Sequence, residues 1–158
     1  MNNLFLPNKH STLKDEPEVA RLLGIYVSTF SLIEFQVFKL FRALVKSNDN
    51  AAHVIMNQIA NFAGKLNLVE DLITSLPNHR RGQEIRQLVN KLRAENKERN
   101  ILVHGIFALD SNGQISVVSN AAKVRAAPGV HPARQSTLEM RCRKAEELYS
   151  EILDLVPS

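Results

Sequence analysis

The fold is decided by the stretch PEVARLLGIYVSTFSLIEFQVFKLFRALVK, residues 17–46. Apolar side chains recur along it every seven residues, and this repeat places them on one wide face of a helix. Asp15, Glu16 and Pro17 supply an acidic start with a proline near the first turn, which favours helix initiation. We therefore expect a central helix of about thirty residues. Its two apolar rows are Val19-Tyr26-Ile33-Leu40 and Leu23-Phe30-Val37-Leu44.

Three further helices are predicted downstream. Asn48-Asp49-Asn50 is a break and a capping cluster, after which one helix is expected over residues 55–73. Leu76-Pro77-Asn78 ends this helix, and the next one runs from residue 79 or 80 to near Gly105. Ser136-Thr137-Leu138-Glu139 matches a capping box and is expected to begin the last helix.

A short β segment is predicted before the last helix. Residues 107–110 and 115–118 flank Asn112-Gly113, the strongest short-range signal for a hairpin because both residues tolerate positive φ. Residues 119–134 hold two prolines and a glycine without an apolar face, which predicts a mobile loop, and residues 1–15 are expected to form an arm. The predicted fold class is all-α: a four- to five-helix bundle with a small β-hairpin insertion, in a single domain spanning residues 1–158.

The composition restricts the class of protein. Lys plus Arg number 20 against 16 Asp plus Glu, a net charge of +4, which permits nucleic acid as a partner without requiring it. Cys142 is the only cysteine, so no internal disulfide forms. The first residues lack the basic and apolar regions of a secretion signal, and every apolar run is interrupted by charge. We expect a cytoplasmic protein with no membrane span.

Arg99 interrupts an apolar row of the third predicted helix. Ile85, Leu92, Arg99 and Ile106 recur every seven residues, a spacing that drifts by only about 20° per repeat. A charge is therefore aimed at the core, and burying an isolated guanidinium is costly unless it is paired. Arg99 needs either a buried partner or a cleft that a ligand fills.

Glu34 and Glu95 are the candidate partners of Arg99. Glu34 interrupts an apolar row of the first helix, and Glu95 precedes Arg99 by one turn, in the favourable Glu-then-Arg direction. Either pair would be part of a functional site or a purely structural ion pair. The two kinds of ion pair look alike in sequence, so both interpretations stay open.

His104 follows Arg99 closely, in the segment RNILVHG at residues 99–105. Asn100 shares the helix face of His104, whereas Arg99 and His104 are about 140° apart on an ideal helix. They can cooperate through the long Arg side chain, a helix distortion or a second chain. The alternative for His104 is a structural interaction with the helix dipole or a carbonyl. Arg125 and His131 have a similar spacing, but nothing in their Pro/Gly segment would hold them in place.

Other common chemistries are not indicated. The histidines are scattered, and neither a metal-ligand pattern nor a Gly-rich phosphate loop occurs, so no metal and no cofactor is expected. Cys142 lies between two arginines, which could lower its pKa, but a single helical cysteine is more often structural. The basic residues His79-Arg80-Arg81, Lys91, Arg93 and Lys97 form either a solvated face or a surface that steers RNA.

The segment from Arg99 to Gly105, late in a helix of an all-α domain, resembles the signature of the HEPN superfamily: Arg followed by a polar residue, and a His with four to six residues between it and the Arg. The resemblance implies a metal-independent endoribonuclease, often a toxin or phage-defence effector, with its cleft formed where two signatures meet in a homodimer. Arg99 would contact the scissile phosphate, Asn100 would orient it, and His104 would be the acid/base. The 2′-OH of RNA would attack phosphorus, leaving a 2′,3′-cyclic phosphate and a 5′-OH.

The resemblance also implies partners of the chain and leaves one alternative function open. The partners implied are RNA, a second copy of the chain and a regulatory protein such as an antitoxin. One HEPN toxin type carries Tyr two residues after the His, where this chain has Ile106, so regulation through that tyrosine is not expected. Because some members of the superfamily are not catalytic, the alternative is a silent helical dimer that binds a nucleotide, a nucleic acid or a protein.

Overall fold

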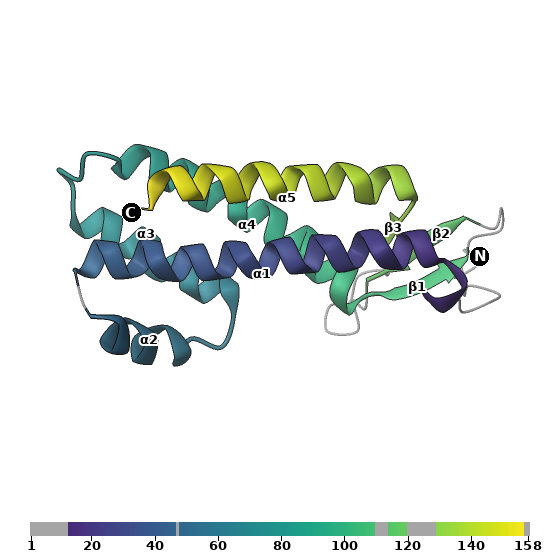
Figure 1. The fold of residues 1–158 in the computed structure, drawn as a ribbon, viewed down its shortest axis with the longest axis horizontal. Helices are drawn as coiled ribbons and strands as arrows, with labels where there is room; N and C mark the ends of the chain where they lie inside the picture. The colour runs from purple at the N-terminus through teal and green to yellow at the C-terminus, as the bar shows by residue number, and fades with distance from the viewer. Residues whose placement is uncertain (1–12, 47, 110–113, 120–128, 157–158) are drawn as a thin grey trace, which may run out of the picture. The chain divides into compact units, whose positions relative to one another are not determined.

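The structure is a computed structural model that describes residues 13–46, 48–109, 114–119 and 129–156. In these residues five α-helices and three short strands follow a single 3₁₀ turn (Figure 1). The predicted all-α class, with a small β insertion before the last helix, is confirmed. The elements are the 3₁₀ turn Leu13–Asp15, α1 (Pro17–Val45), α2 (Asp49–Asn57), α3 (Phe62–Ser75), α4 (Gly82–His104), β1 (Ile106–Leu109), β2 (Ile115–Val118), β3 (Val130–Pro132) and α5 (Gln135–Leu155).

The chain divides into two compact units. The first consists of the described parts of Met1–Val27 and Glu98–Cys142, and the second of those of Ser28–Lys97 and Arg143–Ser158. Three helices, α1, α4 and α5, contribute residues to both units, so each unit is built from segments far apart in sequence.

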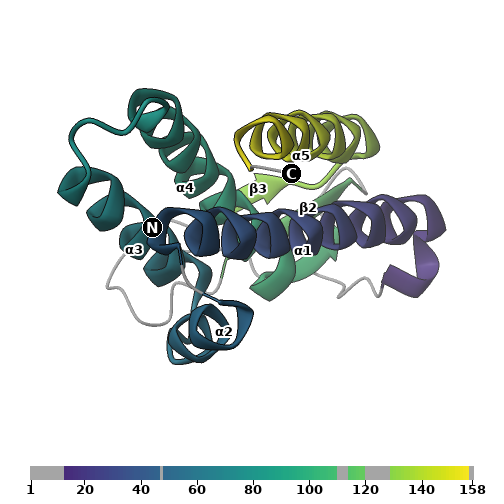
Figure 2. The same cartoon turned by 60° about the vertical axis from the view of Figure 1, so that its left-hand side comes forward.

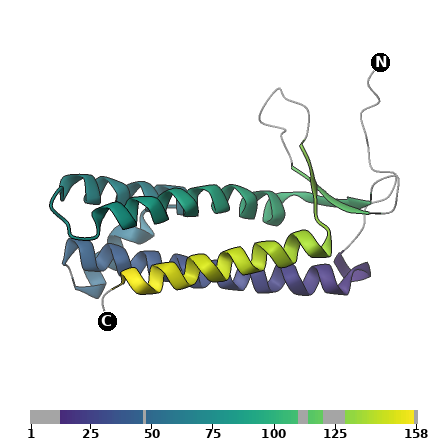
Figure 3. The same ribbon diagram turned by 90° about the horizontal axis from the view of Figure 1, so that it is seen from above.

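The first unit contains the β-sheet. Its strands are antiparallel in the order β1-β2-β3, and the row Ile106, Val118 and Val130 shows the register. Val117, in the central strand, is completely buried, together with Ala133 and Leu138. Figure 3 shows β1 following directly on the end of α4, which places the sheet next to the last turn of that helix.

The second unit is helical. Its core is made of completely buried side chains from four helices, and the rings of Phe30 and Phe62 meet edge to face at 5.3 Å. Burial of this kind is the main stabilising contribution to a helical fold. The core includes Phe30, Ile33 and Val37 of α1, Leu66, Val69 and Ile73 of α3, Leu88 and Leu92 of α4, and Leu148 and Ile152 of α5.

The second predicted helix is wrong, because the structure has two helices there, α2 and α3 (Figure 2). Asn48 caps α2 as the capping cluster predicted, its side chain accepting a hydrogen bond from Ala51 N at 2.9 Å. Asn61 forms a second cap, accepting from Gly64 N at 2.8 Å, and so starts a new helix. Apolar spacing alone missed this break because it continues through both helices.

Residues 119–134 contain a strand that the prediction of a loop missed. β3 pairs with β2 through Val118 and Val130, and Ser119 N donates to Gly129 O at 3.0 Å beside it. The paired strands supply each other's hydrogen bonds, which the sequence of β3 by itself does not indicate. The predicted turn at Asn112-Gly113, the arm at residues 1–12 and residues 120–128 lie outside the described residues.

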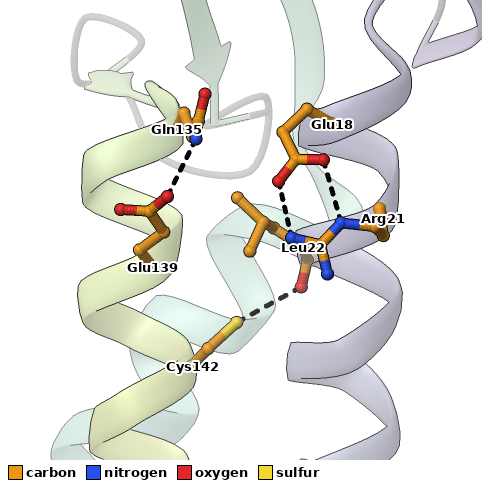
Figure 4. A network of polar contacts seen from close by, with 6 residues as sticks. All are labelled: Glu18, Arg21, Leu22, Gln135, Glu139 and Cys142. Carbon is orange, nitrogen blue, oxygen red and sulfur yellow. Dashed lines mark hydrogen bonds and ion pairs between the residues drawn. The ribbon is translucent and has the colours of Figure 1, made fainter.

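Two predictions at helix ends need correction. Ile106 does not continue the row of Arg99, because α4 ends at His104 and Ile106 begins β1, 49% exposed. Ser136 is not a capping residue, because α5 already begins at Gln135. The side chain of Glu139 instead accepts a hydrogen bond from the Gln135 side chain at 2.8 Å (Figure 4).

The length and composition of α1 would allow it to cross a membrane, contrary to the expectation that no segment would. One third of its most apolar stretch is buried inside the protein, and the two predicted rows supply most of the buried side chains. The core helix of a soluble protein meets the same criterion, so length and composition alone do not distinguish the two cases.

Candidate functional site

The three residues of the signature lie in the last two turns of α4, within the first unit. The final turn is closed by a hydrogen bond from Gly105 N to Ile101 O at 2.9 Å. Since the chain enters β1 directly afterwards, the helix end is tied to the sheet.

Arg99 and Asn100 are joined by a side-chain hydrogen bond. Arg99 Nη1 donates to Asn100 Oδ1 at 3.1 Å, and the carboxamide therefore restricts where the guanidinium points. Arg99 is half-buried and Asn100 is exposed. Arg99 follows two buried residues of its row, Ile85 and Leu92, and is itself only half-buried.

His104 is exposed and is the last residue of α4. A cationic imidazolium at this place interacts favourably with the partial negative charge of a helix C-terminus. The same exposure leaves the ring accessible to a substrate from solvent. Of the signature residues, the structure thus joins Arg99 to Asn100 directly and places His104 four residues further on the same helix.

Gly105 has no space for a side chain. A Cβ atom at this position would lie 2.1 Å from Val117 Cγ1, 2.5 Å from Ile101 O and 3.2 Å from Val118 O. The close approach of backbone and sheet requires glycine. Gly105 therefore fixes the position of His104 relative to β2.

Glu34 and Glu95, the predicted partners of Arg99, belong to the second unit. Glu34 is half-buried on α1, and Glu95 is 3% exposed on α4. A carboxylate as deeply buried as Glu95 requires polar neighbours. The support of Arg99 by either residue stays a prediction.

One arginine near the signature was missed by the sequence analysis. Arg141 of α5 forms an ion pair with Glu98, its Nη2 lying 2.7 Å from Glu98 Oε2. Glu98 directly precedes Arg99, so a second guanidinium lies beside the signature. No local pattern could have identified this contact, because the partners are distant in sequence.

Cys142 is buried and structural, as the sequence favoured. It is 7% exposed, and its thiol donates a hydrogen bond to Leu22 O at 3.4 Å (Figure 4). The pair of Glu18 and Arg21 near it is exposed to solvent, and the Arg21 guanidinium holds the pKa of the Glu18 carboxyl below its usual value. Among the described residues, no group of three or more His, Cys, Asp and Glu could hold a metal ion.

Comparison of the chain with protein-family models, with curated proteins and with solved structures gave no match.

Proposed function

We propose that the chain is a metal-independent endoribonuclease of HEPN type. The observation that supports this proposal is the hydrogen bond that orients the Arg99 guanidinium on Asn100, together with an exposed imidazole at the end of the same helix. Cleavage of RNA without metal requires a cation for the phosphate and a group that accepts and donates protons near neutral pH. Arg99 and His104 supply these two groups.

The reaction begins with the substrate's own 2′-OH. His104 accepts the 2′-OH proton while the 2′ oxygen forms a bond to phosphorus. The bond from phosphorus to the 5′ oxygen breaks, and a protonated imidazole donates the proton that this oxygen takes up. The products are a 2′,3′-cyclic phosphate and a 5′-OH, and the Arg99 guanidinium stabilises the charge on the phosphoryl oxygens.

A homodimer would complete the site. In an in-line displacement the attacking 2′ oxygen and the leaving 5′ oxygen lie on opposite sides of phosphorus. One imidazole does not reach both oxygens, whereas His104 of each copy can take one of the two roles. The chain would act in the cytoplasm on RNA, as a toxin or phage-defence effector controlled by an antitoxin or another regulatory protein.

The test is cleavage of RNA in EDTA by the purified protein and its variants. We expect His104→Ala and Arg99→Ala to abolish cleavage while circular dichroism shows a retained fold. His131→Ala and Arg143→Ala are the matched controls, since they remove the same side-chain types at other described positions. Detection of a 2′,3′-cyclic phosphate at the new end verifies the reaction type.

Four results would contradict the proposal. Cleavage that survives in both site variants, or that requires a divalent ion, excludes the mechanism. A wild-type protein that binds a nucleotide or RNA without cutting it would be the non-catalytic helical dimer instead. If Arg99→Ala only lowers the unfolding temperature, Arg99 is a structural residue.

A further inference from the structure

The second unit has an exposed face that the proposed reaction does not use. It is the side of α1 opposite the core, and we call it the outer face of α1. At 100° per residue, its members lie within about 60° of the direction of Phe35, whereas the buried row Ile33, Val37, Leu44 points the other way. The face consists of Leu32, Phe35, Phe38, Lys39 and Arg42, and Lys46 follows the last residue of the helix.

Two aromatic rings are stacked on this face, with Phe35 exposed and Phe38 half-buried. Phe35 is 51% exposed, and its ring stacks on that of Phe38 with centroids 6.3 Å apart and planes at 25°. The exposed His53 of α2 adds a third ring, 5.1 Å from Phe38. Lys39 Nζ lies 5.0 Å from the centroid of Phe35, a cation–π contact that places a positive charge beside the rings.

The charge of the outer face of α1 has one sign. Lys39 and Arg42 are its ionisable members, Lys46 follows α1 directly, and all three residues are cationic. Glu34 is the only acidic residue between residues 28 and 46, and it lies about 100° around the helix from Phe35. A surface that combines cations with exposed rings is complementary to a chain that carries both phosphates and bases.

Lys46 connects this face to a cleft at the end of α1. The cleft has a volume of about 530 Å³, within the range of small-ligand sites. Lys46, Asn78 and His79 provide polar groups, Leu76 and Pro77 provide apolar walls, and the cleft lining includes no acidic residue. A nucleotide, with a flat base and an anionic phosphate, matches this combination.

The backbone of Lys46 is in the left-handed conformation. Its φ is 50°, in the left-handed region that favours glycine, and among the described residues it is the only non-glycine residue with positive φ. A lysine at this position is less stable than glycine would be. Lys46 directly follows the last residue of α1, where a left-handed residue commonly ends a helix.

We propose that the outer face of α1 and this cleft bind single-stranded nucleic acid. Bases stack on Phe35 and Phe38, and phosphates contact Lys39, Arg42 and Lys46. Together with the proposed function on which it rests, this site makes single-stranded RNA the substrate class.

Binding is tested by fluorescence anisotropy with a labelled 12-nucleotide single-stranded RNA, in the His104→Ala protein so that the probe stays intact. Phe35→Ala should weaken binding about 5- to 150-fold, because stacking of a base on a ring contributes roughly 1–3 kcal/mol. Phe35→Leu should lose most of the same affinity, since it keeps an apolar side chain but has no ring, and Phe35→Trp should retain it. Leu153→Ala, an exposed apolar residue of α5, is the matched control.

The phosphate contacts are tested by salt dependence. Three contacts predict a slope of roughly −2 for log K against log salt, and Lys46→Gly should reduce its magnitude by about 0.7. Because glycine relieves the positive φ, the same variant should unfold at a higher temperature, so affinity falls while stability rises. The control is Lys144→Gln, which removes a lysine at an exposed position of α5 and should leave the slope unchanged. Glutamine is used there because glycine would destabilise the middle of a helix.

The proposal is overturned if the wild-type protein does not bind the RNA, or if Phe35→Ala and Lys46→Gly bind it as the parent does. It is also overturned if Phe35→Leu retains full affinity, or if Phe35→Ala instead abolishes self-association measured by sedimentation, because the face would then hold a second copy. If the outer face of α1 does not bind RNA, the protein with an intact His104 still cleaves a dinucleotide. If the chain is not a ribonuclease, the outer face of α1 still binds RNA.

Discussion

Replacement of Gly105 by alanine tests whether the junction between α4 and the sheet is as tight as the structure indicates. The new Cβ would lie 2.1 Å from Val117 Cγ1 and 2.5 Å from Ile101 O. Van der Waals contact requires at least about 3.4 Å, so both neighbours have to move. Val117 is completely buried in the central strand and Ile101 O belongs to the helix backbone, which leaves neither neighbour an easy way to shift.

The expected loss of stability follows from these contacts. Overpacking costs typically about 1–3 kcal/mol, and the clash with backbone places Gly105→Ala at the upper end. The lower entropy of the unfolded alanine chain offsets about 0.4–1 kcal/mol. We expect a net loss of roughly 2–2.6 kcal/mol, which for a chain of this size lowers Tm by roughly 4–10 °C.

Denaturant unfolding followed by circular dichroism measures this loss. Gly24→Ala is the matched control, because nothing lies within 4 Å of a Cβ at that helical position. It should stabilise the protein by about 0.5–1 kcal/mol. In a Val117→Ala background, where one clashing methyl is absent, Gly105→Ala should cost at least about 1 kcal/mol less than in the parent.

Two outcomes would refute this reasoning. The first is a Gly105→Ala protein as stable as the Gly24→Ala protein, which would mean that the junction has room. The second is an equal cost of Gly105→Ala with and without Val117, which would mean that the helix end does not press on the sheet.

Four further predictions concern single residues. Asn61→Ala should destabilise the protein by about 1 kcal/mol in denaturant unfolding because α3 loses its cap, and Asn61→Ser should stay within a few tenths. The Arg93 guanidinium holds the pKa of the Glu70 carboxyl below 4.5, so the pair stabilises the fold above that pH and this contribution is lost as the pH falls through the lowered pKa. Both side chains are about one third exposed, so Arg93→Met should cost about 0.2–1 kcal/mol at pH 7, and the difference from wild type should disappear in acid; a constant difference would exclude this pair as its cause. Asn100→Ala should lower the rate of RNA cleavage without changing the unfolding temperature, since Asn100 is exposed and orients Arg99; an unchanged rate would remove it from the site. Cys142 should react with a thiol reagent only slowly until denaturant is added, and a fast reaction in the native protein would contradict its burial.

Local patterns predicted most of the helices. The two rows of α1 correspond to buried side chains, apart from the half-buried Leu23, because an apolar stripe of helical period must be covered by other parts of the protein. The hairpin of β1 and β2 was also predictable, since its strands are close in sequence. A break between two helices that leaves the apolar spacing unchanged could not be predicted, and so Asn61 was missed as the cap of α3.

The candidate site was predictable only as a set of residues. The sequence placed Arg99, Asn100 and His104 near the end of one helix, and the structure agrees with this placement. The sequence could not reveal that Arg99 is hydrogen-bonded to Asn100, nor that Arg141 forms an ion pair with Glu98, the residue before Arg99. Side-chain contacts depend on rotamers and on segments distant in sequence, and a local sequence pattern carries information about neither.

The sequence by itself determined the helical class, the long α1 and the position of Arg99, Asn100 and His104 near a helix end, because hydrophobic period and capping are properties of neighbouring residues. Only the tertiary structure decided that Val130 joins a sheet, that Gly105 must lack a side chain, and that His53 of α2 lies beside the ring of Phe38. Each of these depends on atoms brought together by folding, over separations at which sequence spacing carries no information about distance.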